Sequence, residues 1–351
     1  MYLLISIIRN FLFSFGIIKS RHYTDVFVLC VGNIRVGGTG KTPMIEYLIS
    51  NLQDKFSIAV VSLGYKRKTK GLREVQTTDT AEKIGDEPKQ MKAKFPKIPF
   101  FVCKDRNLAI DYIRTKLPQT QLILLDDAYQ YRKTQPNRTI LLTEYNRPYF
   151  KDYILPYGRL RERRKEAKRS SYIIITKCPN TLTQNDKQEF INRLHPLPSQ
   201  KVFFSSIHYK PLIDTHYNTS INTSKNISTN TTNNISTNIT NNISTNTTNS
   251  VDNQTNHIVF VAGIDNPTPA VDYLEGLGYK VILRKYPDHH SFTPTEIEEL
   301  QDLANSHYKL ITTEKDAVRL EKTNLPFSIL PIENEIDNNF ITTLIEDINR
   351  E

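Results

Sequence analysis

The sequence has no tryptophan, only three methionines and three cysteines, and 12 glycines among its 351 residues. Cys30, Cys103 and Cys178 lie far apart and form no C-x-x-C pair. This spacing argues against a cysteine zinc site or a disulfide framework and is typical of a reducing compartment. With so few glycines, a stretch that contains three of them within four residues requires an explanation.

Acidic residues are in the minority. The chain has 46 lysines and arginines against 37 aspartates and glutamates, a net charge of +9, and a pI near 9.2. Such a balance predicts an anionic partner, namely nucleic acid, a phosphorylated lipid or a membrane surface. The length allows a substantial core and fits two domains rather than one.

The N-terminus, "MYLLISIIRNFLFSFGIIKSRHY", is apolar but does not follow the order of a signal peptide. Its charge does not precede the apolar core, and no small residues end it. A buried core helix is a second interpretation, although bulky apolar residues occur all round the helix, which suits lipid better. Arg9 makes full spanning of a bilayer costly. We therefore expect residues 1–22 to form a membrane helix, embedded in or lying on the bilayer, with Lys19, Arg21 and His22 at the head groups.

Short apolar runs alternate with helical patterns from Phe27 to about Thr143, within a domain expected over residues 23–215. The runs include "VFVLCV", "SIAVVSL", "IPFFVC", "QLILLDD" and "RTILLTE". This alternation predicts an α/β fold, with a parallel sheet and helices on both faces. Later runs, "HIVFVAGI", "KVILRKY" and "YKLITTEKD", predict a smaller C-terminal α/β lobe over residues 257–351.

Residues 216–256 have a different composition, almost entirely Asn, Thr, Ser and Ile. The string "NISTN" recurs at Asn226, Asn234 and Asn242. Three short copies without glycine or a consistent apolar face cannot bury a solenoid core. The segment is therefore interpreted as a disordered insertion that links the two lobes.

Residues 35–42 read "RVGGTGKT" between a predicted strand and a predicted helix. A loop around a phosphate needs backbone N–H groups that point inward and small residues that let oxygens approach. In a P-loop, Lys41 would neutralise the β- and γ-phosphates and Thr42 would hold Mg²⁺. Arg35 stands where the first glycine of this motif is usual. The alternative, a glycine turn with a surface lysine, is weakened by the flanking strand and helix. The candidate nucleotide-binding residues are Arg35, Val36, Gly37, Gly38, Thr39, Gly40, Lys41 and Thr42.

Two carboxylates follow the apolar run "QLILL". Asp126 and Asp127 come about 85 residues after the phosphate loop. A carboxylate at the end of a strand beside such a loop is a usual Mg²⁺ ligand, directly or through water. The alternative is a solvated acidic turn. We predict a metal site formed by Thr42, Asp126 and Asp127.

The ordered set "VGNIRVGGTGKTP", "SLGYKRK", "GDEPKQM", "CKDRN", "DDAYQYR", "LPYGRLRE", "VAGIDNP", "YPDHHSFT" and "TTEKDAV" closely resembles the tetraacyldisaccharide 4'-kinase family. The resemblance covers nearly the whole chain apart from the Asn/Thr insertion. It implies a P-loop NTPase-like kinase with an N-terminal membrane helix. The implied reaction is transfer of phosphate from ATP, with Mg²⁺, to the 4'-hydroxyl of an acylated disaccharide 1-phosphate lipid, giving a bis-phosphorylated lipid A precursor. Leu63, Ala128 and Tyr131 depart from the usual family motifs.

The resemblance also implies catalytic residues. A sugar hydroxyl is a poor nucleophile and needs a base within hydrogen-bond reach. Asp86 in "GDEP", expected in a loop between strands, matches the family's proposed base, and His289 or His290 matches its partner; the sequence leaves open which histidine acts. A polar turn with exposed histidines is the alternative for "PDHH". Lys41 completes the candidate catalytic set.

Candidate substrate ligands by resemblance are Arg106, Gln130 and Arg159, since an arginine fork matches phosphate oxygens. The basic run "GRLRERRKEAKRS" lacks the interleaved aromatics of a nucleic-acid site. We expect it to face anionic lipid at the cytoplasmic side of the bacterial inner membrane, with no nucleic-acid partner.

Two other function classes are open to a chain of this kind. A membrane-associated P-loop GTPase or ATPase switch would select guanine through an [N/T]-K-x-D segment, but "TKCP" has Pro179 in place of the aspartate. A non-catalytic lipid-binding scaffold would have no need of the loop lysine, the paired carboxylates and "GDEP" together.

Overall fold

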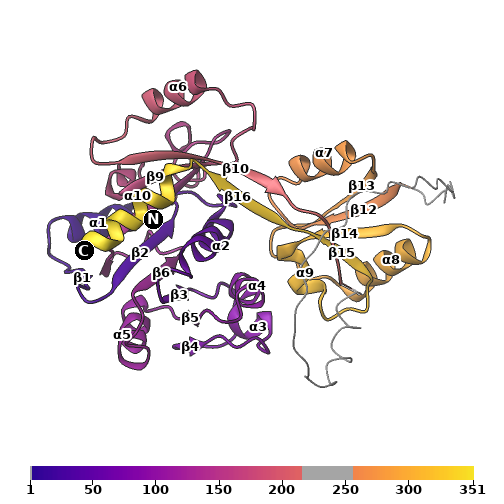
Figure 1. Cartoon of the computed structure of the whole chain (residues 1–351), viewed down its shortest axis with the longest axis horizontal. Coiled ribbons are helices and arrows are strands. Elements are labelled where there is room, and N and C mark those ends of the chain that lie inside the picture. Colours follow the sequence, from indigo (N-terminus) through magenta and orange to yellow (C-terminus); the bar gives the residue numbers. More distant parts are fainter. Residues whose placement is uncertain (1, 216–255) are drawn as a thin grey trace, which may run out of the picture.

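The computed structural model describes residues 2–215 and 256–351. The insertion predicted over residues 216–256 therefore lies outside the described residues, except for Asn256. The described chain forms two lobes side by side (Figure 1). A nine-stranded sheet forms the centre of the larger lobe, and a five-stranded sheet forms the centre of the smaller one.

The large sheet has the strand order β16-β10-β9-β8-β2-β6-β3-β5-β4. Its strands are β2 (Phe27–Gly32), β3 (Ile58–Ser62), β4 (Arg73–Glu74), β5 (Phe100–Val102), β6 (Leu122–Asp126), β8 (Arg138–Glu144), β9 (Tyr172–Thr176), β10 (Lys201–Tyr209) and β16 (Ile332–Ile336). The helices of this lobe are α1 (Tyr2–Ser14), α2 (Lys41–Leu52), α3 (Ala81–Ile84), α4 (Asp86–Lys94), α5 (Arg106–Lys116), α6 (Gln184–Leu194) and α10 (Asn339–Arg350). A separate two-stranded sheet pairs β1 (Arg21–His22) with β7 (Thr134–Gln135).

Every residue of the central strands β2, β3 and β6 is buried. Helices α2, α4 and α10 cover one face of the large sheet, whereas α5 and α6 cover the other. Strands that are buried on both faces explain the continuous Val, Ile and Leu runs of the sequence. The predicted α/β fold with a parallel sheet and flanking helices is confirmed.

The small lobe has the strand order β11-β15-β14-β12-β13. Its elements are β11 (Ile213–Asp214), β12 (His257–Ala262), α7 (Thr268–Gly276), β13 (Lys280–Lys285), α8 (Pro294–Asn305), β14 (Lys309–Thr313), α9 (Glu314–Leu320) and β15 (Phe327–Leu330). Helices α8 and α9 pack with one apolar cluster of this sheet, and α7 packs with the other. This arrangement matches the smaller α/β lobe that the sequence predicted.

The end of the chain returns to the large lobe. Strand β16 pairs antiparallel with β10, from Ser205↔Ile336 to Tyr209↔Ile332, and α10 buries Phe340 and Leu344 in the core of the large lobe. The sequence assigned all of residues 257–351 to the C-terminal lobe, so its last 20 residues were assigned wrongly. An alternation of strands and helices does not reveal which of two sheets a strand joins.

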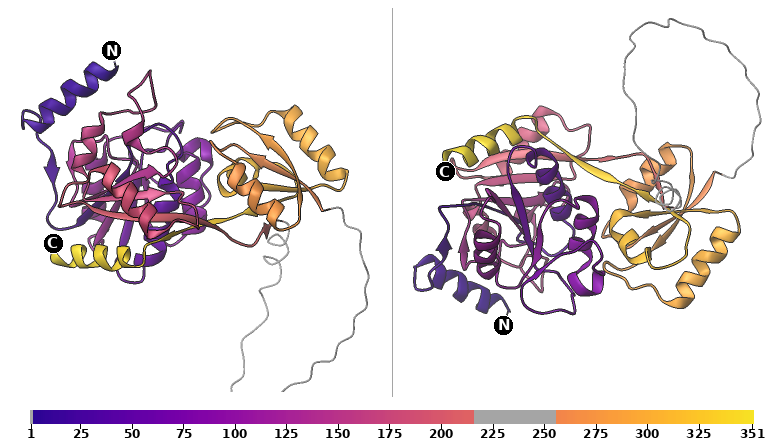
Figure 2. Two further views of the ribbon diagram at one scale, coloured as in Figure 1. Left: turned by 90° about the horizontal axis from the view of Figure 1, so that it is seen from above. Right: turned by 60° about the horizontal axis from the view of Figure 1, so that its bottom comes forward.

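The N-terminal helix is shorter than the predicted 1–22. Helix α1 ends at Ser14, and Gly16 follows in a left-handed conformation, with φ +71°, which ends the helical path. Arg9 and Asn10 donate to Glu162 Oε1 at 2.7 and 2.9 Å. Figure 2 shows α1 beside the large lobe, on the side away from the small lobe. Over residues 2–215 and 256–351, no helix has the length and apolar character needed to cross a membrane.

Candidate active site

The glycine-rich loop connects β2 to α2, as the sequence predicted. Gly37 and Gly40 have φ angles of +117° and +88°, values that residues with a Cβ rarely adopt. Gly40 is the N-cap of α2, and Lys41 is the first residue of the helix. The loop amides and the N-terminus of α2 therefore lie together, which is the arrangement that binds phosphate groups.

Arg35 explains how the loop forms without its usual first glycine. Its buried guanidinium donates from Nη1 to Glu144 Oε2 at 2.7 Å and from Nε to Asp152 Oδ2 at 2.9 Å. The next residue, Val36, donates its backbone N–H to the carbonyl of Arg159 at 2.7 Å. Arg35 was predicted to bind the nucleotide; in the structure its side chain instead ties the start of the loop to two carboxylates.

A second loop, after β9, braces the phosphate loop from outside. Lys177 Nζ donates to the carbonyl of Gly38 at 2.6 Å and also pairs with Glu144. Thr176 Oγ1 donates to the carbonyl of Thr39 at 3.0 Å. Sequence reasoning weighed "TKCP" only as a guanine-selecting segment and missed this role. The signal available was a lysine directly after a buried strand.

Asp126 ends β6 and is almost fully buried. Its Oδ2 accepts from Ser62 Oγ at 2.8 Å, whereas Oδ1 has no partner. Asp127 Oδ1 is likewise buried without a partner. Burial, together with the nearby carboxylates of Glu87 and Asp127, raises the pKa of Asp126 to about 7. Carboxylate oxygens that are buried and unpaired beside a phosphate loop fit the needs of Mg²⁺.

The metal-binding prediction requires ligands from the substrate as well. Among the described residues, no group of three or more His, Cys, Asp and Glu side chains is arranged to hold a metal ion. Thr42, Asp126 and Asp127 would therefore hold Mg²⁺ together with phosphate oxygens, as is usual beside a phosphate loop. The donor set fits Mg²⁺, which tolerates few protein ligands.

Two cations face Asp127 Oδ2. Lys41 Nζ lies 3.8 Å from this oxygen and Arg161 Nη1 lies 3.5 Å from it. Arg159 was predicted as a substrate ligand, whereas Arg161, two residues later in the same basic run, was not. The guanidinium of Arg159 pairs instead with Asp265 of the small lobe, at 3.5 Å, while its Nη1 stays beside Gly37 of the phosphate loop. The direction of each side chain depends on the local backbone path, so the choice between these arginines required the structure.

The other predicted substrate residues lie around the loop. Gln130 Nε2 donates to the carbonyl of Asn33 at 2.6 Å, just after the end of β2. Arg106 is buried and donates to the carbonyls of Cys103 and Lys104 at 3.1 and 3.0 Å. Burial lowers the pKa of Arg106, and the charges of Asp126 and Asp127 oppose that shift. Arg106 is therefore a buried countercharge behind the paired carboxylates.

The structure pairs Asp86 with one of the two candidate histidines. Asp86 is the first residue of α4, not part of a loop between strands as expected. His289 Nδ1 lies 2.8 Å from Asp86 Oδ2. His290 instead contacts Glu296 at 2.9 Å and stacks on Tyr286. Of the two histidines, His289 completes the predicted pair.

Helix α9 adds two cations that sequence reasoning missed. Arg319 donates from Nη2 and Nε to Asp86 Oδ2 at 2.7 and 3.2 Å. Lys315 Nζ lies 3.3 Å from His289 Nε2 and 2.5 Å from Asp288. Burial raises the pKa of Asp86, but hydrogen bonds from His289 and Arg319 outweigh it and lower that pKa to about 2. The spacing of Lys315 and Arg319, four residues apart on one helix, could have indicated a shared face.

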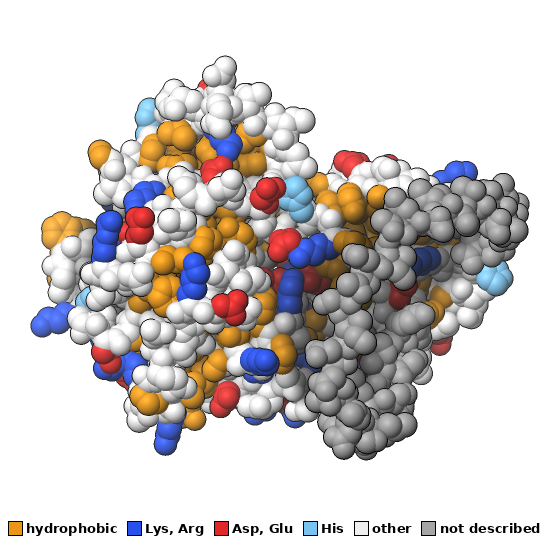
Figure 3. Space-filling model, in the orientation of Figure 1, with side chains coloured by type: hydrophobic (Ala, Val, Ile, Leu, Met, Phe, Trp, Pro, Cys, Tyr) orange, Lys and Arg blue, Asp and Glu red, His pale blue; other side chains and the backbone are white. Residues whose placement is uncertain are grey.

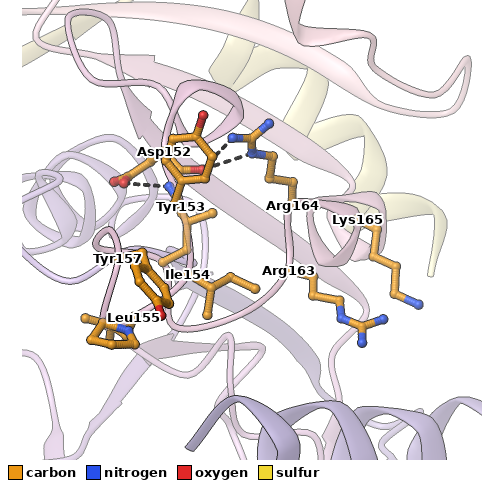
Figure 4. Close-up of a pocket in the computed structure, with 10 residues that line it drawn as sticks. Asp152, Tyr153, Ile154, Leu155, Tyr157, Arg163, Arg164 and Lys165 are labelled. Atoms are coloured by element: carbon orange, nitrogen blue, oxygen red, sulfur yellow. Dashed lines mark hydrogen bonds between the residues drawn. The ribbon is translucent and has the colours of Figure 1, made fainter.

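Two cavities lie beside segments that hold the phosphate loop: one contains Asp152, which binds Arg35, and the other contains Cys178, which follows Lys177. The larger has a volume of about 1030 Å³ and is lined by the segment from Asp152 to Tyr157 and by Leu160, Arg163, Arg164 and Lys165 (Figure 4). The smaller, of about 380 Å³, lies beyond the β9 loop and is lined by residues that include Cys178, Phe204 and Asp337. The smaller cavity borders the carboxyl end of β9, and ligands bind at the carboxyl ends of the strands in open α/β folds.

Comparison with known proteins gives consistent results. The family profile described as "Tetraacyldisaccharide-1-P 4'-kinase" matches residues 1–349. The tetraacyldisaccharide 4'-kinase of Flavobacterium johnsoniae is 37% identical over 99% of this chain and 94% of that protein, and that of Bacteroides thetaiotaomicron is 36% identical over 95% and 86%. A crystal structure of LpxK from Aquifex aeolicus in complex with ATP shares the fold, with a TM-score of 0.69 at 24% identity over 99% of this chain and 95% of that one. The chain belongs to the tetraacyldisaccharide-1-P 4'-kinase family.

Proposed function

We propose that this protein transfers the γ-phosphoryl group of ATP to the 4'-hydroxyl of a tetraacyldisaccharide 1-phosphate lipid. Membership of the kinase family supports the reaction class. The observation that carries the proposal is that the Asp86–His289 pair lies near the phosphate loop and its carboxylates. Asp86 pairs with His289 and is followed directly in the sequence by Glu87. The negative charge of Glu87 is close enough to raise the pKa of Asp126, which lies beside the phosphate loop. A candidate base and a phosphate-binding loop thus lie at one site.

The large lobe binds the phosphate donor in this scheme. The loop amides and Lys41 contact the β- and γ-phosphates, where positive charge offsets the negative charge of the transferring group. Thr42, Asp126 and Asp127 would hold Mg²⁺, which would supply further charge neutralisation when bound. Lys177 and Arg35 keep the loop in its binding shape, because each ties it to Glu144.

The acceptor hydroxyl is activated by Asp86 and His289. Since the pKa of Asp86 is lowered to about 2, its carboxylate is ionised at neutral pH and able to accept a hydrogen bond from the hydroxyl. His289 contacts the same carboxylate and either orients it or shares the proton. Tyr65 packs edge-on against the imidazole, with ring centroids 5.3 Å apart, and limits its movement.

The lipid part of the substrate and the membrane surface have a matching surface on this chain. Helix α1 is turned outward: Ser6 and Asn10 are buried, while apolar side chains of the N-terminal segment are exposed. The exposed side chains are Ile8, Phe11, Phe15, Ile17 and Ile18. A solvent-facing apolar stripe on a short helix is typical of a segment that lies in a membrane interface. We assign this surface to the cytoplasmic face of the bacterial inner membrane.

The larger cavity offers a second surface suited to lipid. Tyr157 is 93% exposed, and the ring of Tyr153 packs against the guanidinium of Arg164 (Figure 4). Arg163 and Lys165 line the same cavity. Aromatic rings with cations at their edge suit acyl chains with an anionic head group. The cavity therefore supports an anionic lipid as acceptor.

The smaller cavity suits the adenine base. It lies next to Lys177 and Cys178, on the side of the phosphate loop toward β10. A switch GTPase would place a base-selecting aspartate in this loop, where Pro179 stands. The alternative, a membrane-associated GTPase or ATPase switch, is therefore not favoured.

Label transfer tests the proposal directly. Purified protein in detergent would be incubated with Mg²⁺, ATP labelled at the γ-phosphate, and the disaccharide 1-phosphate lipid. We expect label in the lipid and little ATP consumption without it. Parallel reactions with GTP, and with a disaccharide that already carries a 4'-phosphate, control for donor and position. ATP or GTP hydrolysis that does not depend on lipid would support the switch instead.

A further inference from the structure

Arg319 is a buried arginine that joins the two lobes. Its side chain is only 9% exposed. From α9 of the small lobe it donates to Asp86 of the large lobe through Nη2 at 2.7 Å and Nε at 3.2 Å. Its remaining terminal nitrogen, Nη1, donates to Asp316 Oδ1 at 3.0 Å. The guanidinium therefore has a carboxylate on each side and little freedom to rotate.

Asp316 is held in place by contacts within the small lobe that do not involve Arg319. It has no exposed surface, and its Oδ2 accepts from the backbone N–H of Gly263 and from Thr313 Oγ1, both at 2.8 Å. A Cβ on Gly263 would lie 2.7 Å from Asp316 Oδ1, so only glycine permits this approach. The small lobe thus presets the direction in which the fork of Arg319 points.

The hydrogen bonds on the Asp86 carboxylate are unequally divided. Within residues 2–215 and 256–351, the bonds from Arg319 and from His289 all end on Oδ2. The second oxygen, Oδ1, takes none of them. A carboxylate held through one oxygen by a planar fork and a ring nitrogen has its rotation fixed, and its other oxygen is available to a ligand.

We propose that Arg319 is a positioning residue for phosphoryl transfer: it holds Asp86 by Oδ2 so that Oδ1 faces the acceptor hydroxyl. This inference rests on the proposed function. Arg319 does not touch the reacting atoms; it acts through Asp86, and its Nη2 also lies 3.1 Å from Nδ1 of His289, the partner of Asp86. A displacement of the catalytic carboxylate by about 1 Å costs on the order of 10²-fold in rate. Lysine cannot replace the fork, because an ammonium group binds as a single point.

The alternative role for Arg319 is to tie the lobes together. Glu321, next to α9, provides a matched control, since it also joins the lobes through an ion pair, 3.5 Å from Lys89, but does not touch Asp86. If tying the lobes were the whole role, Glu321→Gln would reproduce part of the loss. If positioning is the role, Glu321→Gln leaves kcat within about twofold of the wild type, as surface pairs contribute little.

The experiment measures kcat and the KM for ATP of the full-length wild type and of Arg319→Ala, Arg319→Lys, Glu321→Gln, Asp86→Asn and the double variant Arg319→Ala/Asp86→Asn. We expect Arg319→Ala and Arg319→Lys to lose on the order of 10²-fold in kcat, with the KM for ATP unchanged. Added guanidinium at non-denaturing concentration should partly restore Arg319→Ala but not Arg319→Lys, whose side chain fills the site. The double variant should be no slower than Asp86→Asn.

Three results would overturn the inference: Arg319→Ala within twofold of the wild type, losses that multiply in the double variant, or Arg319→Lys at full activity. Thermal melting of each variant shows whether a loss of activity is caused by unfolding. Restoration of activity by added guanidinium shows that the variant is folded and that its site is only misaligned. Failure of the proposed function itself is distinct, because the wild type would then transfer no label to the lipid.

Discussion

The two lobes hold their functional groups in different ways. The large lobe carries the phosphate loop and Asp126 at the ends of strands that are buried on both faces. The small lobe contributes His289 from a loop and Arg319 from the seven-residue helix α9. The first arrangement is built within one lobe, whereas the second meets its partner Asp86 only where the two lobes touch.

The junction between the lobes combines an aromatic contact, Tyr209 of β10 on Tyr273 of α7 with ring centroids 4.7 Å apart, with a set of ion pairs. Each lobe has its own buried apolar clusters, and ion pairs connect the two. These pairs are Asp86–Arg319, Lys94–Glu314, Lys89–Glu321, Arg147–Asp265 and Arg159–Asp265. Acidic and basic side chains also lie next to one another where the lobes meet in Figure 3. Polar interfaces within a chain separate readily, so we expect the assembled base to depend on closure of the lobes, which also excludes water from phosphoryl transfer.

The largest effect should come from breaking the half of the site in the large lobe. Lys41→Ala removes the charge proposed to meet the β- and γ-phosphates, and we expect kcat/KM to fall on the order of 10³-fold. The fold should persist, because the ion pair of Lys41 with Asp127 is long, at 3.8 Å. Label transfer and thermal melting measure the two properties. Lys55→Ala, at an exposed lysine beyond the end of α2, is the control, and activity of Lys41→Ala near that of Lys55→Ala would contradict the nucleotide assignment.

Asp86→Asn tests the junction itself. We expect kcat to fall on the order of 10²-fold with little change in the KM for ATP, because no phosphate contact is removed. Combining this change with His289→Ala should cost less than the product of the single losses, as for residues that act as a unit. Steady-state kinetics of the two single variants and the double variant measure this. Fully multiplying losses would mean that the two residues act independently.

The two neighbouring histidines sharpen the comparison within the small lobe. His289→Ala should lose roughly tenfold in kcat, as expected when an orienting partner is removed. His290→Ala should stay within about twofold, since His290 contacts Glu296 and Tyr286 of its own lobe. The same kinetic assay applies, and each variant serves as the control for the other. Equal losses would show that the geometry of the pair does not determine catalysis.

A smaller effect, on stability, should appear at Glu46, which meets Lys94 and, through it, Glu314 of the small lobe. Burial and the charge of Glu314 raise the pKa of Glu46 to about 7. The folded protein therefore binds more protons than the unfolded chain between the ordinary glutamate pKa and about 7, and its stability falls as pH rises through that window. Glu46→Gln should be more favourable to stability at pH 8 than at pH 5, by on the order of 1–3 kcal/mol.

Urea unfolding of the wild type and Glu46→Gln at the two pH values measures this difference. Glu333→Gln is the matched control, because it removes an exposed carboxylate on β16 by the same chemical change. If Glu46→Gln instead loses stability relative to the wild type as pH rises, the ion pair with Lys94 outweighs the burial of Glu46.

The smallest effect should follow removal of residues 216–255. Strand β11 pairs antiparallel with β15, and β12 runs parallel to β15 in the same sheet. The last residue of β11 and the first residue of β12 therefore lie at the same end of the strands. Three strand spacings, about 14 Å, separate them. We expect a flexible linker of about eight residues to bridge this gap and leave kcat within about twofold. A large loss in a folded variant would reveal a function for the insertion.

Much of the large lobe could be predicted because its signals are local. The runs that became β2 and β6 are continuous apolar stretches, and the glycine spacing suits the backbone angles found at Gly37 and Gly40. The order of strand, loop and helix follows from neighbouring residues alone. Arg35 was the exception: its side chain serves Glu144, which lies 109 residues away.

The sequence by itself determined the α/β class, the phosphate loop and the paired carboxylates, because each depends on residues close together in the chain. Only the tertiary structure decided that His289 rather than His290 meets Asp86, 203 residues away, that Arg161 rather than Arg159 faces Asp127, and that β16 and α10 belong to the large lobe. Such choices depend on how the lobes pack and which way each side chain points. The local sequence pattern indicates neither the packing of the lobes nor the direction of a side chain, because contacts between residues far apart in the chain depend on the complementarity of whole surfaces.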